Sequence, residues 1–114
     1  MKGQALTLRP ILIDASSSSN GFTRLLGGPP QSVFMRAGKV VLQPWETVGE
    51  HSTGEKEELI IILDGEGEFL YGDNHSLPFH SNAVLYCPPM TKHNILNTGS
   101  TPLQYIYVVS KALQ

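Results

Sequence analysis

The stretch that decides the fold spans residues 51–65 and reads HSTGEKEELIIILDG, from His51 to Gly65. An imidazole and several carboxylates run here directly into the most hydrophobic segment of the chain, Leu59 to Leu63. Polar groups beside a buried apolar run are costly unless they have partners, and a bound cation is a common way to supply one. The stretch therefore predicts a buried strand with a candidate metal site at its start.

A second stretch, residues 88–97, reads PPMTKHNILN and brings His93 to the start of another strand. These two stretches resemble the two conserved motifs of the cupin family, which has ten defining positions. Six of the ten agree in identity and spacing: His51, Glu58, Gly65, Pro88, His93 and Asn97. The resemblance covers about residues 33 to 109, and agreement in two separated motifs is a strong signal for the fold and a weaker one for activity.

Four motif positions depart from the cupin pattern. Trp45 and Asn82 replace the leading glycines of the two motifs, and Met90 replaces the glycine of the turn. Thr53 stands where the family has its second metal-binding histidine, which makes it the departure that matters most for chemistry.

The resemblance implies a metal site built from His51, Glu58 and His93. Two histidines and one carboxylate with open coordination positions suit Fe(II), Mn(II), Ni(II) or Zn(II). Thr53 is expected beside the metal, where its hydroxyl could hold a bound water. The motif spacing selects Glu58 as the inward carboxylate, on the same strand face as Ile60 and Ile62. Glu57 is the alternative, since a bulge after Thr53 would exchange the two.

Each candidate ligand also has a structural interpretation. His51 and His93, taken singly, are typical of surface or core histidines, and Glu58 could pair with Lys56 or Lys92. Cys87 lies beside two prolines without a basic neighbour, which favours a buried packing residue over a nucleophile.

Length, charge and composition narrow the class of protein. A chain of 114 residues is expected to form one domain over residues 1–114. The net charge of −2 gives no reason to expect nucleic acid or an anionic membrane as a partner, and eight of the ten acidic residues lie between Glu46 and Glu68. One cysteine excludes an intrachain disulfide, and no signal peptide or membrane span is visible, so a cytoplasmic protein is expected.

Short apolar segments between Gly and Pro clusters predict an all-β sandwich or barrel. We expect an edge strand at 6–13, one or two strands over 33–43 with a turn or bulge at Gly38, and a strand at 59–63 covered on both faces. A hairpin turn at 64–67 should return the chain as a strand at 68–71, and four more candidates lie at 77–79, 83–87, 94–96 and 104–109. The resemblance sharpens this fold to a double-stranded β-helix, the cupin jelly-roll barrel, and implies a homodimer.

Two function hypotheses follow. The first is a metal-dependent enzyme of the dioxygenase or isomerase type acting on a small polar molecule, which the retained His51, Glu58 and His93 favour. The second is a small-molecule or sugar-binding module without turnover, which Thr53 favours. The sequence identifies neither the substrate nor any catalytic residue.

Overall fold

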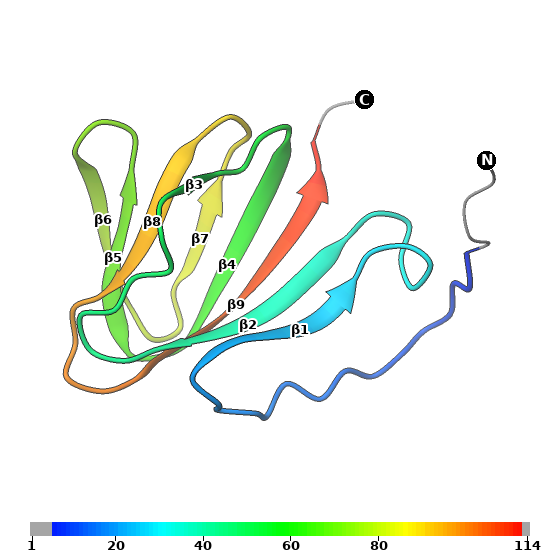
Figure 1. Cartoon of the computed structure of the whole chain (residues 1–114), viewed down its shortest axis with the longest axis horizontal. Coiled ribbons are helices and arrows are strands. Elements are labelled where there is room, and N and C mark those ends of the chain that lie inside the picture. The colour runs from blue at the N-terminus through cyan, green and yellow to red at the C-terminus, as the bar shows by residue number, and fades with distance from the viewer. Residues whose placement is uncertain (1–5, 113–114) are drawn as a thin grey trace.

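The computed structural model describes residues 6–112. Within this range the chain forms nine strands and no helix (Figure 1): β1 Gly21–Gly27, β2 Arg36–Leu42, β3 His51–Ser52, β4 Lys56–Asp64, β5 Glu66–Tyr71, β6 His75–His80, β7 Val84–Cys87, β8 Lys92–Asn97 and β9 Leu103–Lys111. The all-β prediction is confirmed for these residues. None of them belongs to a helix long and apolar enough to cross a membrane.

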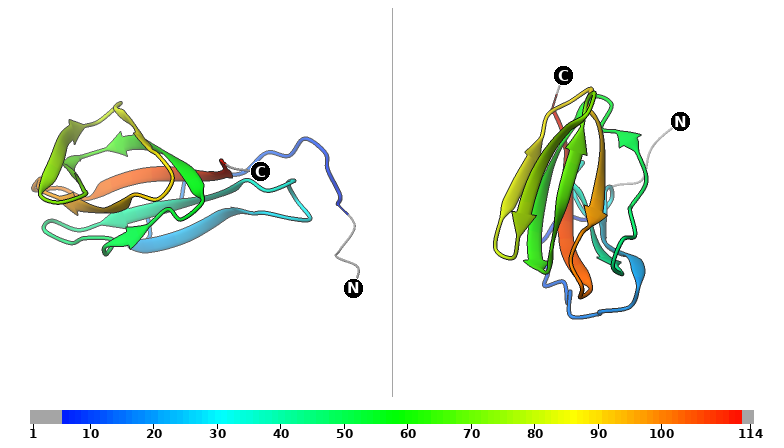
Figure 2. Two further views of the ribbon diagram at one scale, coloured as in Figure 1. Left: turned by 90° about the horizontal axis from the view of Figure 1, so that it is seen from above. Right: turned by 90° about the vertical axis from the view of Figure 1, so that its left-hand side faces the viewer.

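The strands form two antiparallel sheets (Figure 2). The larger has the order β1-β2-β9-β4-β7, and the smaller has the order β3-β8-β5-β6. Apolar side chains from both sheets fill the space between them, among them Ile60 and Tyr105 from the larger sheet and Phe69 and Ile95 from the smaller. This core supports one end of the sandwich, where β3 and β8 bring the two sequence motifs together.

Only one face of β4 is buried. Ile60 and Ile62 are 0% and 1% exposed, whereas Leu59 and Leu63 are 40% and 41% exposed on the other face. The prediction of a strand covered on both faces is therefore wrong for the described chain, because none of residues 6–112 covers the outer face of β4 at Leu59 and Leu63. The continuous apolar run of residues 59–63 therefore gives β4 a hydrophobic outer face.

The predicted hairpin at residues 64–71 is also wrong. Gly65 has a φ of +98°, and the chain passes there from one sheet to the other, so β5 pairs with β6 and β8 instead of returning along β4. A Cβ on Gly65 would lie 2.9 Å from the Cα of Leu103. Glycine is thus required at this crossing for its conformation and for the close approach of a neighbouring strand.

Gly38 lies within a continuous strand, β2, and not at the turn or bulge predicted there. A Cβ on Gly38 would meet the ring of Phe22 at 2.6 Å and the hydroxyl of Tyr107 at 2.7 Å. The irregularity falls on the neighbouring strand, where the register of β1 shifts between Arg24 and Leu26. Gly38 therefore makes room for two aromatic rings.

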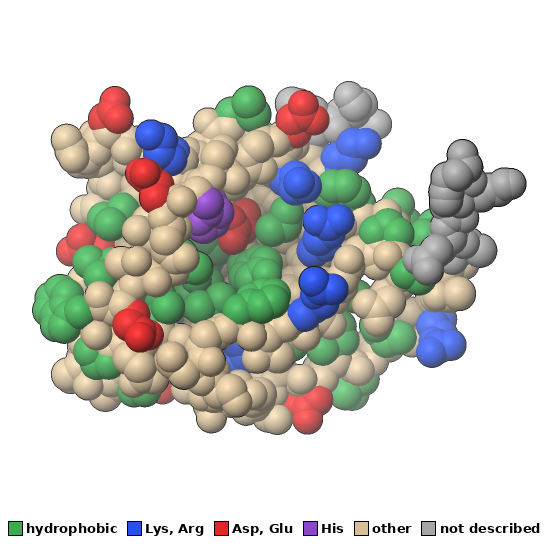
Figure 3. All heavy atoms as spheres, in the orientation of Figure 1, with side chains coloured by type: hydrophobic (Ala, Val, Ile, Leu, Met, Phe, Trp, Pro, Cys, Tyr) green, Lys and Arg blue, Asp and Glu red, His purple; other side chains and the backbone are tan. Residues whose placement is uncertain are grey.

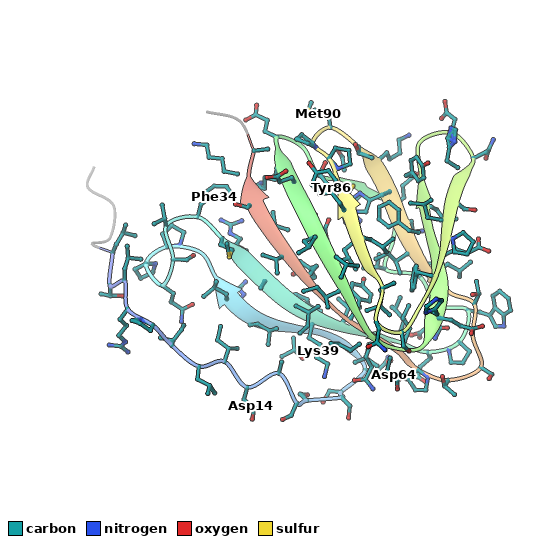
Figure 4. All side chains as sticks on the ribbon, turned by 180° about the vertical axis from the view of Figure 1, so that it is seen from behind. Asp14, Phe34, Lys39, Asp64, Tyr86 and Met90 are labelled. Atoms are coloured by element: carbon teal, nitrogen blue, oxygen red, sulfur yellow. The ribbon has the colours of Figure 1, made fainter. Side chains whose placement is uncertain are left out.

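The predicted edge strand at residues 6–13 is absent from the structure. Residues 6–19 run without strand pairing. The polar contacts that hold the segment include a hydrogen bond from Thr7 N to Pro30 O at 3.0 Å and one from Lys39 Nζ to Ala15 O at 2.7 Å. Figure 4 labels Lys39 on the sheet and Asp14 on this segment. The apolar side chains of residues 6–13 remain exposed within the single chain, with Leu12 at 92%.

Three of the four departures from the cupin motifs occupy a backbone conformation that favours glycine. Trp45, Asn82 and Met90 have φ values of 68°, 73° and 56°, in the left-handed region. Asparagine tolerates this region, but tryptophan and methionine are strained in it by about 1–2 kcal/mol. The backbone has thus kept the geometry of the motif glycines at positions where the side chain has changed.

We expect Trp45→Gly and Met90→Gly each to raise the free energy of unfolding, by about 1 kcal/mol after allowance for the more flexible unfolded chain. Both side chains are more than two-thirds exposed, at 69% and 71%, so little packing is lost. Urea unfolding measures the change. Trp45→Ala and Met90→Ala are the matched controls, because alanine removes the side chain and keeps the strained φ. Stabilisation by alanine equal to that by glycine would contradict backbone strain as the cause.

Candidate metal centre

The three candidate ligands come from three strands that meet at one end of the sandwich. His51 lies on β3 directly opposite His93 on β8, and Glu58 lies on β4 of the facing sheet. Their ligand atoms all lie within 4.8 Å of one another, and the two imidazole rings are 4.2 Å apart between centroids. A single cation could therefore reach a nitrogen of each histidine and an oxygen of Glu58.

His93 is held firmly in one orientation. The ring is buried and stacks on Phe69 at 5.4 Å between centroids. Nδ1–H donates to the Thr91 carbonyl oxygen at 3.1 Å, and Nε2 lies 3.1 Å from Glu58 Oε1. Because a carbonyl oxygen only accepts, Nδ1 carries a proton, and Nε2 is the nitrogen that could bind a metal beside Glu58.

His51 has the same arrangement on a more exposed side chain. Its Nδ1–H donates to the Gly49 carbonyl oxygen at 2.8 Å, which leaves the lone pair of the neutral ring on Nε2. In metal sites, a hydrogen bond of this kind commonly fixes the tautomer and orientation of a ligating histidine. In both histidines a carbonyl oxygen thus engages Nδ1, which leaves Nε2 as the nitrogen that could bind a metal.

Glu58 and Glu57 point to opposite sides of β4. Glu58 is buried on the inner face, as strand parity and the motif spacing predict. Glu57 accepts a hydrogen bond from the Tyr86 hydroxyl at 2.7 Å on the outer face of the larger sheet. The pairing of Glu58 with Lys56 or Lys92 is not observed, since its partner is His93.

Thr53 is occupied by backbone contacts between two loops. Its hydroxyl donates to Pro88 O at 2.9 Å and accepts from Thr91 N at 3.2 Å. Thr53 therefore joins the segment before β4 to the turn before β8, and these contacts engage the hydroxyl that could otherwise hold a bound water. Threonine replaces the motif histidine at this position, and its hydroxyl links the two motif segments through hydrogen bonds to their backbone.

Cys87 lies behind the site as a buried thiol. Its Sγ is 3.6 Å from His93 Nδ1, and burial, followed by the negative charge of Glu58, raises the pKa of the thiol to about 11. Such a thiol stays protonated at neutral pH and is a poor nucleophile. The structure agrees with the interpretation of Cys87 as a packing residue.

Opposing influences set the pKa of His93. Burial lowers it most strongly, but the hydrogen bonds to Glu58 and to the Thr91 carbonyl and the charge of Glu58 together raise the pKa above its ordinary value. When His93 is protonated, it forms a buried ion pair with Glu58 in the metal-free protein. A metal at Nε2 would have to displace this proton.

This ion pair predicts a pH dependence of stability in the metal-free protein. Because the folded pKa of His93 exceeds the unfolded value of about 6.5, the stabilisation is fully present below that pH and is lost as the pH rises through the folded pKa. Urea unfolding of chelator-treated protein across this range measures the effect. Glu58→Gln should flatten the decline, and an unchanged pH profile in this variant would contradict the ion pair.

The three side chains stand at one side of a cavity of about 660 Å³ between the sheets. Figure 3 shows the hollow, with a hydrophobic floor, a histidine and an acidic side chain on one side, and basic side chains on another. Its lining includes Val40, Leu42, Ile95, Tyr105 and Tyr107, together with Phe22, Arg36 and Lys56. A cavity of this size and apolar character suits a small organic molecule.

Sequence reasoning did not single out Arg36 or Lys56 as lining residues. Lys56 shares the inner face of β4 with Glu58, so strand parity alone could have placed it near the site. Arg36 reaches the cavity through the pairing of β2 with β9, and that register is not visible in a single sequence.

The fold and the site define a jelly-roll barrel with a candidate metal centre in its mouth. Residues 38–109 match the family model described as a cupin domain. The chain therefore belongs to the cupin family, as the two motifs indicate.

Two curated proteins and one solved structure are similar to this chain. The chain is 28% identical over 82 residues to a glucose-6-phosphate isomerase of Pyrococcus abyssi, covering 68% of this chain and 43% of that protein. It is 31% identical over 71 residues to an oxalate-binding protein of Thermotoga maritima, covering 62% and 58%. The chain thus spans about half the length of the curated relatives that it matches.

An RmlC-like cupin of Methanocaldococcus jannaschii with a double-stranded β-helix fold superposes with a TM-score of 0.75 at 17% identity, over 90% of this chain and 91% of that one. This similarity confirms the predicted double-stranded β-helix.

Proposed function

We propose that this cupin is a metal-dependent enzyme of the dioxygenase or isomerase type that acts on a small polar molecule. The observation that carries the proposal is the convergence of His51, Glu58 and His93, with ligand atoms within 4.8 Å, beside a cavity large enough for an organic substrate. A divalent Fe, Mn, Ni or Zn ion suits this donor set. One relative is named an isomerase, which supports small-molecule chemistry on a similar chain.

The protein's own residues would hold the ion. Both histidines present Nε2 because their Nδ1 atoms are engaged by carbonyl oxygens, and Glu58 supplies a buried negative charge. A bound ion would act as a Lewis acid toward substrate oxygens. The apolar side chains of the cavity would strengthen this electrostatic effect by lowering the local polarity. We assign no catalytic residue.

A binding module without turnover is the alternative function. The engaged Thr53 hydroxyl supports it, because a site with three protein ligands lacks one donor of the full motif. A relative named an oxalate-binding protein supports small-molecule binding.

A melting experiment tests the proposal. Metal-free protein is heated with Mn²⁺, Fe²⁺, Ni²⁺ or Zn²⁺, and with Mg²⁺ as the control, because Mg²⁺ prefers oxygen ligands. At a concentration 100 times the dissociation constant, a ligand of the folded state adds about 2.7 kcal/mol of stability, so the melting temperature should rise for at least one transition metal and not for Mg²⁺. No rise for any transition metal would contradict the proposal.

We also propose a homodimer, with the outer face of the larger sheet as the interface. Leu59, Val84 and Tyr86 are 40%, 59% and 56% exposed on this face. Figure 4 shows the molecule from behind and labels Tyr86. The exposed apolar residues of the segment 6–13 add to the surface that a second copy could cover. Light scattering after size-exclusion chromatography gives the mass in solution, and a monomeric mass would contradict the dimer.

The expected cytoplasmic location stays a prediction.

A further inference from the structure

We infer that the cavity binds an organic anion, whose charged group lies against Arg36 and Lys56. The inference rests on the proposed function only in placing a small molecule in this cavity. It assigns a chemical class to that molecule from side chains that the metal site does not use.

Strand register places four basic residues at one end of the larger sheet, on its inner face. Lys56 on β4 lies directly opposite Lys111 on β9, and Arg36 on β2 lies opposite Val109, which in turn faces Glu58. Arg24, opposite Gly38, lies on the same face of the neighbouring strand. Of these basic residues, Arg36 and Lys56 line the cavity itself.

These charges are not neutralised within the described part of the chain. The one ion pair among residues 6–112 joins His93 to Glu58, so Arg36 and Lys56 have no carboxylate partner there. Two lysines directly opposite each other on neighbouring strands repel each other. A bound anion would relieve this repulsion and supply the missing counter-charge.

The rest of the cavity defines the body of the anion. Its inner part is apolar and aromatic, with Tyr105, Tyr107 and Phe22 among the lining residues, and it contains no unpartnered buried polar atom in the described chain. Lys56 lies two residues from Glu58 on the same face, which separates the two positions by roughly 7 Å along the strand. A molecule with one anionic end and a compact apolar body would therefore reach from Arg36 and Lys56 toward the candidate metal ligands.

Arg36 is suited to recognise a planar anionic group. A guanidinium can donate two parallel hydrogen bonds to a carboxylate or a phosphate, and charge-assisted bonds of this kind are about twice as strong as neutral ones. The shared chemistry is an oxyanion on an apolar scaffold, and the carboxylate and phosphate forms can be separated by experiment.

Calorimetric titration with benzoate, phenyl phosphate and the neutral isostere benzamide tests the inference. We expect at least one anion to bind roughly tenfold or more tightly than benzamide, and higher salt to weaken only the anions. The tighter of the two anions identifies the oxyanion. Equal binding of all three probes, or no binding of any, would overturn the inference.

Charge-removing variants locate the effect. Arg36→Gln and Lys56→Gln should each reduce the preference for the anion several-fold and leave benzamide affinity unchanged. Lys92→Gln is the matched control, because Lys92 is exposed, lies next to His93 on β8 and does not line the cavity. An equal loss in Lys92→Gln would show a general charge effect and overturn the assignment to Arg36 and Lys56.

The metal content of the same samples keeps this inference separate from the proposed metal site. Selective anion binding in a protein that takes up no transition metal would contradict the metal proposal and support the anion subsite. Metal uptake without any preference for the anions would do the reverse. Unchanged metal uptake by Arg36→Gln and Lys56→Gln would show that these variants keep the folded site.

Discussion

Replacing His93 by alanine is expected to abolish transition-metal binding by this cupin. His93 offers Nε2 beside Glu58 Oε1, so the variant loses one of three protein ligands and leaves the remaining carboxylate without its partner. The affinity should fall by more than the roughly 10- to 100-fold that follows when only a hydrogen-bond partner of a ligand is removed. Calorimetric titration of metal-free protein with Zn²⁺ or Mn²⁺ measures the change.

Glu58→Gln tests the same site with little change in side-chain volume. It should weaken metal binding strongly while the β-sheet circular dichroism persists, because the core is apolar and extends over both sheets. His80→Ala is the matched control, since His80 is an exposed histidine outside the group of three. Wild-type affinity in His93→Ala and Glu58→Gln would show that the ion binds elsewhere.

Asn97→Ala is expected to destabilise the fold by about 3–5 kcal/mol. The side chain is fully buried, and its Nδ2 donates to Leu42 O and Thr101 O, both at 2.9 Å. Its Oδ1 accepts from Gly99 N at 2.8 Å. Alanine leaves the buried Leu42 O and the part-buried Thr101 O and Gly99 N without their partner, and each unsatisfied buried group costs about 1–3 kcal/mol. Urea unfolding of the metal-free protein measures the loss.

Asn94→Ala provides the comparison on the same strand. The Asn94 oxygen accepts from Gly49 N at 2.9 Å, but the side chain is only partly buried, so water can replace much of the contact. We expect a loss of about 1 kcal/mol there. A loss of only about 1 kcal/mol for Asn97→Ala as well would mean that its hydrogen bonds to Leu42, Gly99 and Thr101 do not stabilise the fold as we expect.

The motif positions could be predicted from the sequence because their spacing reflects local backbone geometry. Alternation along β4 was sufficient to place Glu58 on the inner face and Glu57 on the outer one, and the structure has this arrangement. The spacing of His93 and Asn97 also places both on the buried face of β8. Each of these predictions depends on residues fewer than ten positions apart.

Pairing between distant segments could not be predicted in the same way. Asp64-Gly65 has the composition of a hairpin turn, yet the chain changes sheets there, since the partners of β5 lie on β6 and β8. Residues 6–13 have the apolar content of a strand but find no strand partner within the described chain. The absence of glycine at two motif positions was also misleading, because Trp45 and Met90 adopt the left-handed backbone conformation that glycine normally supplies.

The basic residues that line the cavity were the hardest part to predict, because their proximity depends on the pairing of strands that are distant in the sequence. Arg36 and Lys56 are separated by twenty positions in the sequence and come from β2 and β4, which β9 separates in the sheet. Their common role as lining residues follows from that strand order, which places a late segment of the chain between two early ones.

Elemental analysis by mass spectrometry tests the central claim most directly. Wild-type protein and Glu58→Gln are expressed without a histidine tag, purified without chelators and measured side by side. A metal site at His51, Glu58 and His93 predicts a near-stoichiometric transition metal in the wild type and little in the variant. Equal metal in both proteins, or none in the wild type even after dialysis against Fe, Mn, Ni and Zn salts, would contradict it.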